Sequence, residues 1–327
     1  MSTVLSTKKL ANSVPTARAI RSLNSFKTRK AVAKGYLERL NAKSSNVNPD
    51  LNFKTGTKYA FKASTKEYFT HNVMLGWEWE IENTEGGLRQ YQNLIKDLAK
   101  DLRTLHYGWL GSDGGYREVR SVPCTAALHK ELLIDRDVFK TADNEGRLNC
   151  GYRVHDSTGG HIHIGLASIP NCKTLARMFE FLRFNAPILN QTVFNRSYGA
   201  DFSTDTNYHT KVRNLLAMGN KPIPAKWSKP ETYIREVGIA SRKGYKLSYR
   251  GKTVELRSFR SPKTIDGVVA NLQFCDAFVR FCSTDDELTY DNFVKFVRTH
   301  NSDSSPRNRV YGFLDEKLSA FEQVAKY

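Results

Sequence analysis

The sequence predicts an α+β fold, in which strands with one apolar face form a sheet and amphipathic helices pack against it. Two observations support this prediction. Four short stretches alternate apolar and polar side chains with the period of two typical of a strand, and longer stretches carry apolar residues at helical spacing. At 327 residues the chain can bury a full core, as one large domain or two small ones.

The clearest of the four stretches is residues 159–165, with the sequence GGHIHIG. Successive side chains of a strand point to opposite faces, so His161 and His163 share one face while Ile162 and Ile164 share the other. Two imidazoles are therefore expected on one surface.

Three further stretches place carboxylates or arginine on the face that is not apolar. These charged residues are Glu78, Glu80 and Glu82 in 76–82, Glu118 and Arg120 in 117–122, and Glu255 and Arg257 in 253–259. Trp77 and Trp79 alternate with the first set and are expected to anchor the core, whereas Glu82 is expected to be a solvated strand end. If the four strands are neighbours, their polar face is a surface for metal and phosphate.

An antiparallel sheet with one solvated face also shows this alternation, and for any single strand that simpler interpretation stands. A solvated face, however, usually mixes Lys, Thr, Ser and Gln. Like charges side by side destabilise a strand unless something neutralises them. Three glutamates at i, i+2 and i+4 therefore call for a cation.

Net charge divides the chain into a basic N-terminal extension, residues 1–70, and a remainder, residues 71–327. The formal net charge is +17, and residues 1–70 hold fourteen Lys and Arg against three acids, which places +11 there. Such a block is most often an arm that binds nucleic acid or another acidic surface. Residues 18–40 are expected to be helical with a basic side, or the extension to be flexible, and residues 43–66 to form a linker.

Helices are expected between and after the strands. The apolar spacing predicts them at 88–105, 124–140, 173–194 with a kink at Pro187, 264–283, 286–299 and 310–325. A further strand is expected at 107–110, a turn at Asp113 and a polar loop at 141–158. Residues 195–252, rich in Arg, Lys, Tyr, Gly and Pro, are predicted to be loops that cover a site, and they include Arg213.

Several classes of protein fit the sequence poorly. No stretch approaches eighteen apolar residues, so no membrane span is expected, and the N-terminus lacks the apolar segment of a secretory signal, although its composition superficially resembles an organelle transit peptide. The five cysteines are odd in number and show no CxxC spacing, and Cys275 and Cys282 are expected to be buried in a helix. A reducing compartment, the cytoplasm, fits best.

Gathered on one face, Glu78, Glu80, Glu118, His161 and Glu255 offer four carboxylates and an imidazole. Such a set suits Mg²⁺ or Mn²⁺ rather than zinc, because hard cations prefer oxygen ligands. Arginines beside two or three such ions would clamp a triphosphate. The sequence contains no Walker A loop or dinucleotide fingerprint, so metals and arginines would have to bind phosphate.

Four motifs in order resemble a known family. GWEWE at 76–80, SDG at 112–114 followed by Glu118, GHIH at 160–163 and VELR at 254–257 are similar to the motifs of carboxylate–amine ligases related to glutamine synthetase and glutamate–cysteine ligase. The resemblance is strongest to the amidoligase branch common in bacteria and phages, and it covers residues 73–262. Two positions depart from the family's pattern on its substrate side. The family commonly has serine where this chain has Gly115, and Ser121-Val122-Pro123 matches the family's motif only loosely.

The resemblance implies a curved, mostly antiparallel sheet that forms a funnel, with helices on its outside and ATP at its mouth. It implies transfer of the γ-phosphate to a substrate carboxylate and displacement by an amine, so that an amide forms between small molecules or on a protein side chain. The metal ligands it implies are Glu78, Glu80, Glu118, His161 and Glu255. His163, Arg257 and Arg213 are the nucleotide-side residues, and Arg257, Arg260 and Asp113 are the catalytic ones, although Asp113 also fits a plain turn and Arg260 a pair with a sheet glutamate.

Two alternatives remain open from the sequence. The chain could be a nucleic-acid-binding or virion-associated phage protein whose ligase-like fold no longer turns over, as the basic arm suggests. It could also be a metal-dependent nuclease, since acidic metal sites beside basic surfaces also serve phosphodiester hydrolysis. Intact metal glutamates favour the ligase over the inactive scaffold, and the order of the motifs argues against the nuclease.

Overall fold

The computed structural model describes residues 73–81, 108–113, 116–121, 123–135, 139, 159–194, 208–224, 247–249, 253–262, 264–301 and 309–324. The predicted arm at 1–70, the helix at 88–105, the loop at 141–158 and Glu82 lie outside these residues. The boundary near residue 70 therefore stays a prediction.

The described strands form one six-stranded sheet in the order β2-β3-β1-β4-β6-β5, and every pairing is antiparallel. The strands are β1 (Leu75–Ile81), β2 (Gly108–Asp113), β3 (Tyr116–Ser121), β4 (Gly159–Gly165), β5 (Leu247–Tyr249) and β6 (Thr253–Arg260). All four strands predicted from alternation are confirmed as neighbours, with β1 between β3 and β4. The strand predicted at 107–110 corresponds to β2.

The two faces of the sheet separate side chains as the alternation predicts. Trp77, Trp79 and Val119 are almost fully buried, and Trp79 pairs with Val119 across β1 and β3. Ile162 pairs with Leu256 on the same face across β4 and β6. The two tryptophans are therefore core anchors, as predicted.

A β-bulge in β6 interrupts the simple alternation. Ile162 pairs with Leu256 and Gly160 with Phe259, so two residues of β6, Arg257 and Ser258, lie opposite one residue of β4. The extra residue turns Phe259 to the apolar face, where its ring packs 5.1 Å from that of Phe194. Uninterrupted alternation would have placed Phe259 among the charged side chains.

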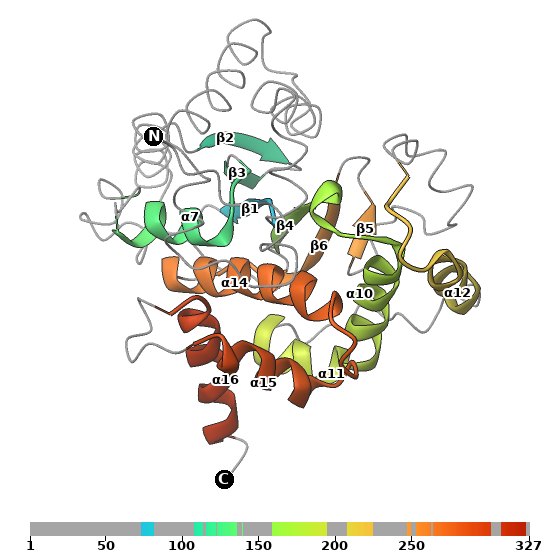
Figure 1. The fold of residues 1–327 in the computed structure, drawn as a ribbon. Helices are drawn as coiled ribbons and strands as arrows, with labels where there is room; N and C mark the ends of the chain where they lie inside the picture. The colour runs from blue at the N-terminus through green and yellow to red at the C-terminus, as the bar shows by residue number, and fades with distance from the viewer. Residues whose placement is uncertain are drawn as a thin grey trace, which may run out of the picture.

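Helices cover the apolar face in a layer around α14 (Figure 1). Within the described ranges these are α7 (Ala126–Lys130), α10 (Cys172–Phe184), α11 (Ala186–Leu189), α12 (Tyr208–Met218), α14 (Ile265–Cys282), α15 (Tyr290–Thr299) and α16 (Gly312–Val324). α14 contacts β1 and β4, and its side chains are buried almost throughout because it lies between the sheet and the outer helices. The predicted α+β fold and the helices at 264–283, 286–299 and 310–325 are confirmed.

Helix ends follow local chemistry. The Thr264 hydroxyl accepts a hydrogen bond from the Gly267 amide and begins α14, as the Thr289 hydroxyl does with the Asn292 amide at α15. The predicted helix at 173–194 breaks at Asn185, two residues before Pro187, and continues as α11 and a π-helical turn, η3 (Asn190–Phe194). The predicted helix at 124–140 is α7 followed by the π-helical turn η1 (Glu131–Asp135).

Two expectations need correction. Residues 195–252 were predicted to be loops, but α12 lies within this range and packs against α10, because Val212 and Leu215 supply a short buried stripe. The described part of the sheet is not strongly curled, so the funnel shape is not part of the fold as described.

Buried thiols and the helix lengths agree with two further expectations. Cys275 and Cys282 are buried in α14, Cys124 and Cys172 are buried in their own segments, and none of these four cysteines forms a disulfide. None of the helices within the described ranges combines the length and apolarity that crossing a bilayer requires.

Candidate metal centre

The polar face of the sheet gathers six side chains that we call the glutamate–histidine cluster. Its members are Glu78 and Glu80 of β1, Glu118 of β3, His161 and His163 of β4, and Glu255 of β6. The pairing register explains the gathering, since Glu78 lies opposite Arg120 on one side and His161 on the other. His163 lies opposite Glu255 in the next row.

Glu78 lies at the centre of the cluster. One carboxylate oxygen, Oε2, is 3.5 Å from Nδ1 of His161, and the other, Oε1, is 3.4 Å from Nε2 of His163 and 3.6 Å from Nε of Arg120. Burial alone would raise the pKa of Glu78. Attraction to His163, hydrogen bonds with both histidines and the nearby Arg120 outweigh burial and hold this pKa well below its usual value.

Glu118 is almost fully buried and forms a close ion pair with Arg120 two residues later. Burial raises the pKa of Glu118 to about 9, helped by repulsion from Glu78 and opposed by Arg120. Glu118 also lies directly opposite Glu80 in the pairing of β1 and β3. Two carboxylates facing each other across strands destabilise a sheet unless a cation or a proton lies between them.

Glu255 connects the histidines to Arg257. Its Oε1 lies 3.6 Å from Nδ1 of His161 and 4.0 Å from Nε2 of His163, and it forms a close ion pair with Arg257. The Nδ1 of His163 is 3.1 Å from the hydroxyl of Thr253. Since Thr253 holds Nδ1, the Nε2 atom of His163 is directed to the carboxylates.

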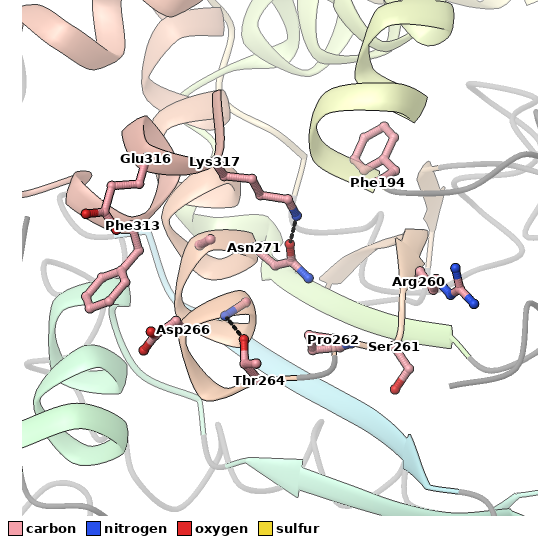
Figure 2. Close-up of a pocket in the computed structure, with 12 residues that line it drawn as sticks. Phe194, Arg260, Ser261, Pro262, Thr264, Asp266, Asn271, Phe313, Glu316 and Lys317 are labelled. Atoms are coloured by element: carbon pink, nitrogen blue, oxygen red, sulfur yellow. Dashed lines mark hydrogen bonds between the residues drawn. The ribbon is translucent and has the colours of Figure 1, made fainter. Parts of the chain in front are cut away.

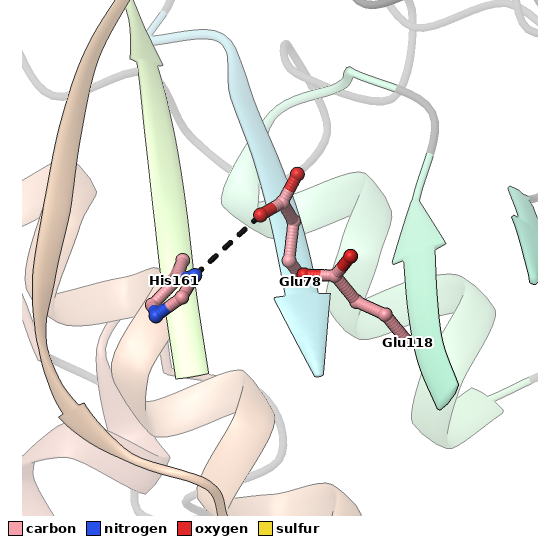
Figure 3. Close-up of side chains that lie close together, drawn as sticks. All are labelled: Glu78, Glu118 and His161. Atoms are coloured by element: carbon pink, nitrogen blue, oxygen red, sulfur yellow. Dashed lines mark ion pairs between the residues drawn. The ribbon is translucent and has the colours of Figure 1, made fainter. Parts of the chain in front are cut away.

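Two sets of three residues bring their ligand atoms within 4.8 Å of one another, which is close enough to hold a metal ion. The first set is Glu78, Glu118 and His161 (Figure 3), and the second is Glu78, His163 and Glu255. Ligand atoms around an octahedral Mg²⁺ lie about 3.0 Å apart when adjacent and about 4.2 Å apart when opposite. The distances from Glu78 and Glu255 to the histidines are 3.4–4.0 Å and lie between these two values. The residues therefore fit two neighbouring cations that share Glu78.

The charge balance of the cluster is also suited to a cation. Four carboxylates face two guanidinium groups, those of Arg120 and Arg257, so these six groups together carry two negative charges when all are ionised. One divalent ion would balance them. Burial raises the pKa of Glu118 most, repulsion from Glu78 adds to this, and a proton there would remove one of the two charges.

The other predicted site residues lie at different distances from this centre. Glu80 belongs to neither set of three, since its Oε2 accepts a hydrogen bond from the Gly159 amide at 2.6 Å, while its Oε1 is 3.9 Å from Nε2 of His161. Asp113 ends the edge strand β2 in a register position on the polar face, opposite Tyr116. Arg260 ends β6 and lines a cavity beside α14.

Arg213 is a predicted site residue that the structure places away from the cluster. It is exposed on α12, and α12 packs on α10 at the edge of the helical layer (Figure 1). Among the described side chains, Arg213 contacts no member of the glutamate–histidine cluster.

Sequence reasoning missed two contributors to the site. Arg120 shares a face with Glu118 in the sequence pattern but has no predicted role, although it pairs with Glu118 and lies beside Glu78. Thr253, which positions His163, has no sequence prediction. The sequence signal for Thr253 is its position two residues before Glu255, on the same face of the same strand.

Comparisons with known proteins gave no assignment. No protein-family model matches the chain, and no curated protein sequence matches it at a significant level.

Proposed function

We propose that the chain is an ATP- and Mg²⁺-dependent ligase that forms an amide bond between a carboxylate and an amine through an acyl phosphate. One observation carries the proposal: two overlapping sets of metal ligands share Glu78 on the polar face of one antiparallel sheet, with Arg257 adjacent. This arrangement agrees with the motif order that resembles the amidoligases. The proposal also includes the expectation that the sheet continues into a funnel beyond its described strands.

The residues have distinct tasks in this proposal. The cations are held by Glu78, Glu118, His161 and Glu255. Glu80 completes the outer edge of the metal site. Bound cations would bridge phosphate oxygens and neutralise the charge that develops during transfer. Mn²⁺ could replace Mg²⁺, because each set of three includes an imidazole.

Basic groups bind the nucleotide and the transferred phosphoryl group. Arg257 contacts phosphate after exchanging its carboxylate partner Glu255 for the ligand, and Arg260 binds beside it. His163 faces the nucleotide. Asp113 acts on the substrate side, and Arg213 reaches the nucleotide only if α12 approaches the cluster on binding.

Calorimetry of ATP binding tests the metal dependence. ATP is expected to bind the full-length protein with Mg²⁺, and Glu78→Gln is expected to weaken this binding because it removes a ligand common to both sets. Glu287→Gln makes the same change at an exposed position between α14 and α15 and is the matched control. Equal affinity for ATP with and without Mg²⁺ would contradict the proposal.

A screen for ADP release over pairs of carboxylates and amines tests the reaction itself. Intact-mass detection should be run in parallel, so that a protein side chain that accepts or donates the amide is also found. A pair that releases ADP only when both partners are present identifies the substrates. Metal-dependent ATP hydrolysis that no amine accelerates would argue against amide formation.

A second function is favoured by a separate observation. Arg120 and Arg257 already form close ion pairs with Glu118 and Glu255, so two of the four carboxylates are neutralised without any metal. Such pairing suits a nucleic-acid-binding or virion-associated protein on an inactive ligase-like fold, with the basic residues 1–70 as the binding arm.

Deletion of residues 1–70 distinguishes the arm from the sheet as the source of binding. On this second proposal, the deletion abolishes most salt-sensitive DNA or RNA binding while ATP binding in the presence of Mg²⁺ is absent from both proteins. Unchanged nucleic-acid binding after the deletion would refute a binding arm.

A further inference from the structure

A cavity of about 690 Å³ lies beside the first turns of α14, where α16 crosses α14 (Figure 2). Its wall includes Arg260 at the end of β6, Pro262 two residues later, Asn271 from α14, Phe194 from η3 and Lys317 from α16. This volume is in the range of small-molecule sites, which are largely apolar with a few polar groups. None of the residues that line the cavity belongs to the glutamate–histidine cluster.

Lys317 extends from α16 across this cavity toward Asn271. Its Nζ donates hydrogen bonds to the carbonyl of Val193 at 2.5 Å and to Oδ1 of Asn271 at 3.1 Å. Both partners are neutral oxygens that can only accept. In the part of the chain that the structure describes, no carboxylate oxygen lies within 4.0 Å of Nζ of Lys317, so Lys317 forms no ion pair there.

This environment suits a neutral amine better than an ammonium ion. A neutral amine has two N–H groups, which the two oxygens accept, and a lone pair that remains for reaction. An ammonium ion would have a third N–H without an acceptor among the described residues, and a buried charge without a counter-ion. Burial accordingly lowers the pKa of Lys317 to about 8.

We propose that Lys317 is a nucleophilic amine that forms a Schiff base with small carbonyl compounds bearing a carboxylate, which Arg260 binds in the same cavity. Lysines desolvated in apolar pockets are activated in this way. The nitrogen lone pair attacks the carbonyl carbon, and the carbonyl oxygen leaves as water with the two nitrogen hydrogens, giving an imine. The proposal extends beyond the ligase and does not depend on it.

Competition among the lysines of the native full-length protein tests this proposal. The probe is glyoxylate with sodium cyanoborohydride at pH 7, which fixes each imine as a secondary amine, and peptide mapping gives the rate at each lysine. A pKa near 8 in place of about 10.5 gives roughly 300-fold more neutral amine at this pH. Lower basicity and access through the cavity reduce that advantage, so Lys317 is expected to react at least about tenfold faster than exposed Lys295.

Lys173 is a second reference, since its Nζ forms an exposed ion pair with Asp285 at 2.7 Å. A rate at Lys317 equal to or below the rates at Lys173 and Lys295 would overturn the proposal. Because this comparison is made within the wild-type protein, it does not depend on whether a variant folds. Lys317→Met should remove the fast-labelled site without lowering the melting temperature, because the variant buries no uncompensated amine.

The role of Arg260 is tested with a neutral aldehyde. The ratio of the Lys317 rate to the Lys295 rate should be higher for glyoxylate than for propionaldehyde, and Arg260→Gln should remove this preference while leaving propionaldehyde labelling unchanged. Ratios that are equal for the two aldehydes in the wild-type protein would contradict recognition of a carboxylate by Arg260.

Discussion

The two faces of the central sheet differ in what their neighbouring residues do to one another. On the helix-covered face, Trp79 packs 6.1 Å from Trp77 and 6.3 Å from Phe139, measured between ring centroids, and these ring contacts favour folding. On the polar face, Glu80 lies opposite Glu118, and like charges there oppose folding. The first face stabilises the fold, whereas the second keeps charged groups together at a cost, which is typical of binding sites.

The largest test of this comparison removes a ring from the helix-covered face. Trp79 is 1% exposed, and Trp79→Ala should lower the free energy of unfolding by about 3–5 kcal/mol through lost burial and a cavity. Urea denaturation measures this loss, and Trp79→Phe, which keeps an aromatic ring, should lose less than half as much. A loss below about 1 kcal/mol for the alanine variant would show that this face does not dominate stability.

A titratable group in the helical layer provides the second test. His129 of α7 is fully buried, and its Nε2 donates to the Leu75 carbonyl at 2.8 Å. Burial lowers the pKa of His129 to about 4, although the hydrogen bond opposes this. Between pH 6.5 and pH 4 the unfolded chain therefore binds a proton that the folded chain does not. Stability should be complete above pH 6.5 and fall by on the order of 3 kcal/mol toward pH 4.

The contribution of His129 is isolated by comparison with a variant that does not titrate. His129→Gln keeps an N–H donor for the Leu75 carbonyl and should show a flatter dependence of stability on pH over this window. Parallel curves for the two proteins, measured by denaturation at each pH, would assign the effect to other groups.

The third test addresses the polar face through metal affinity. Glu78 belongs to both sets of ligands and Glu80 to neither, although they share a strand, a face and a residue type. Glu78→Gln should weaken Mn²⁺ binding by about 100-fold, or about 2.7 kcal/mol, and Glu80→Gln by less than about fivefold. Calorimetric titration with Mn²⁺ measures both, and equal losses would show that the ligands are not the two sets described above.

The smallest expected effect concerns the residue that positions His163. Thr253→Val removes the hydroxyl that is 3.1 Å from Nδ1 of His163 while keeping the shape of the side chain. Mn²⁺ affinity should fall about tenfold, which is typical for partners that orient a metal-binding histidine. Thr253→Ser retains the hydroxyl and should bind Mn²⁺ like the wild type. A valine variant with unchanged affinity would leave His163 oriented by other contacts.

Much of this arrangement could be predicted from the sequence where a period is regular. Alternation was sufficient to place Glu78, His161 and Glu255 on one face, because each side chain's direction depends only on its own strand. Their adjacency could be inferred only by assuming that the strands are neighbours. Strand order depends on how distant segments pair, and a local pattern carries little information about this.

Other features depend on contacts that the sequence does not display. The bulge at Arg257 and Ser258 arises from pairing with β4, and nothing in β6 alone announces it. The close pair of Arg120 with Glu118 became visible only once both side chains were placed in the buried interior. α12 was overlooked because its apolar stripe is short, with Leu216 exposed beside buried Leu215.

The bulge in β6 makes the length of this strand as important as its composition. Inserting one residue after Ser258 would leave every existing amino acid unchanged, yet regular pairing beyond the bulge would then carry Phe259 out of its aromatic neighbourhood and bring Arg260 into it. A conservative substitution at Ser258 leaves the phase of the strand intact. Relatives of this protein should therefore vary in residue type at this point without gaining a residue between Glu255 and Phe259.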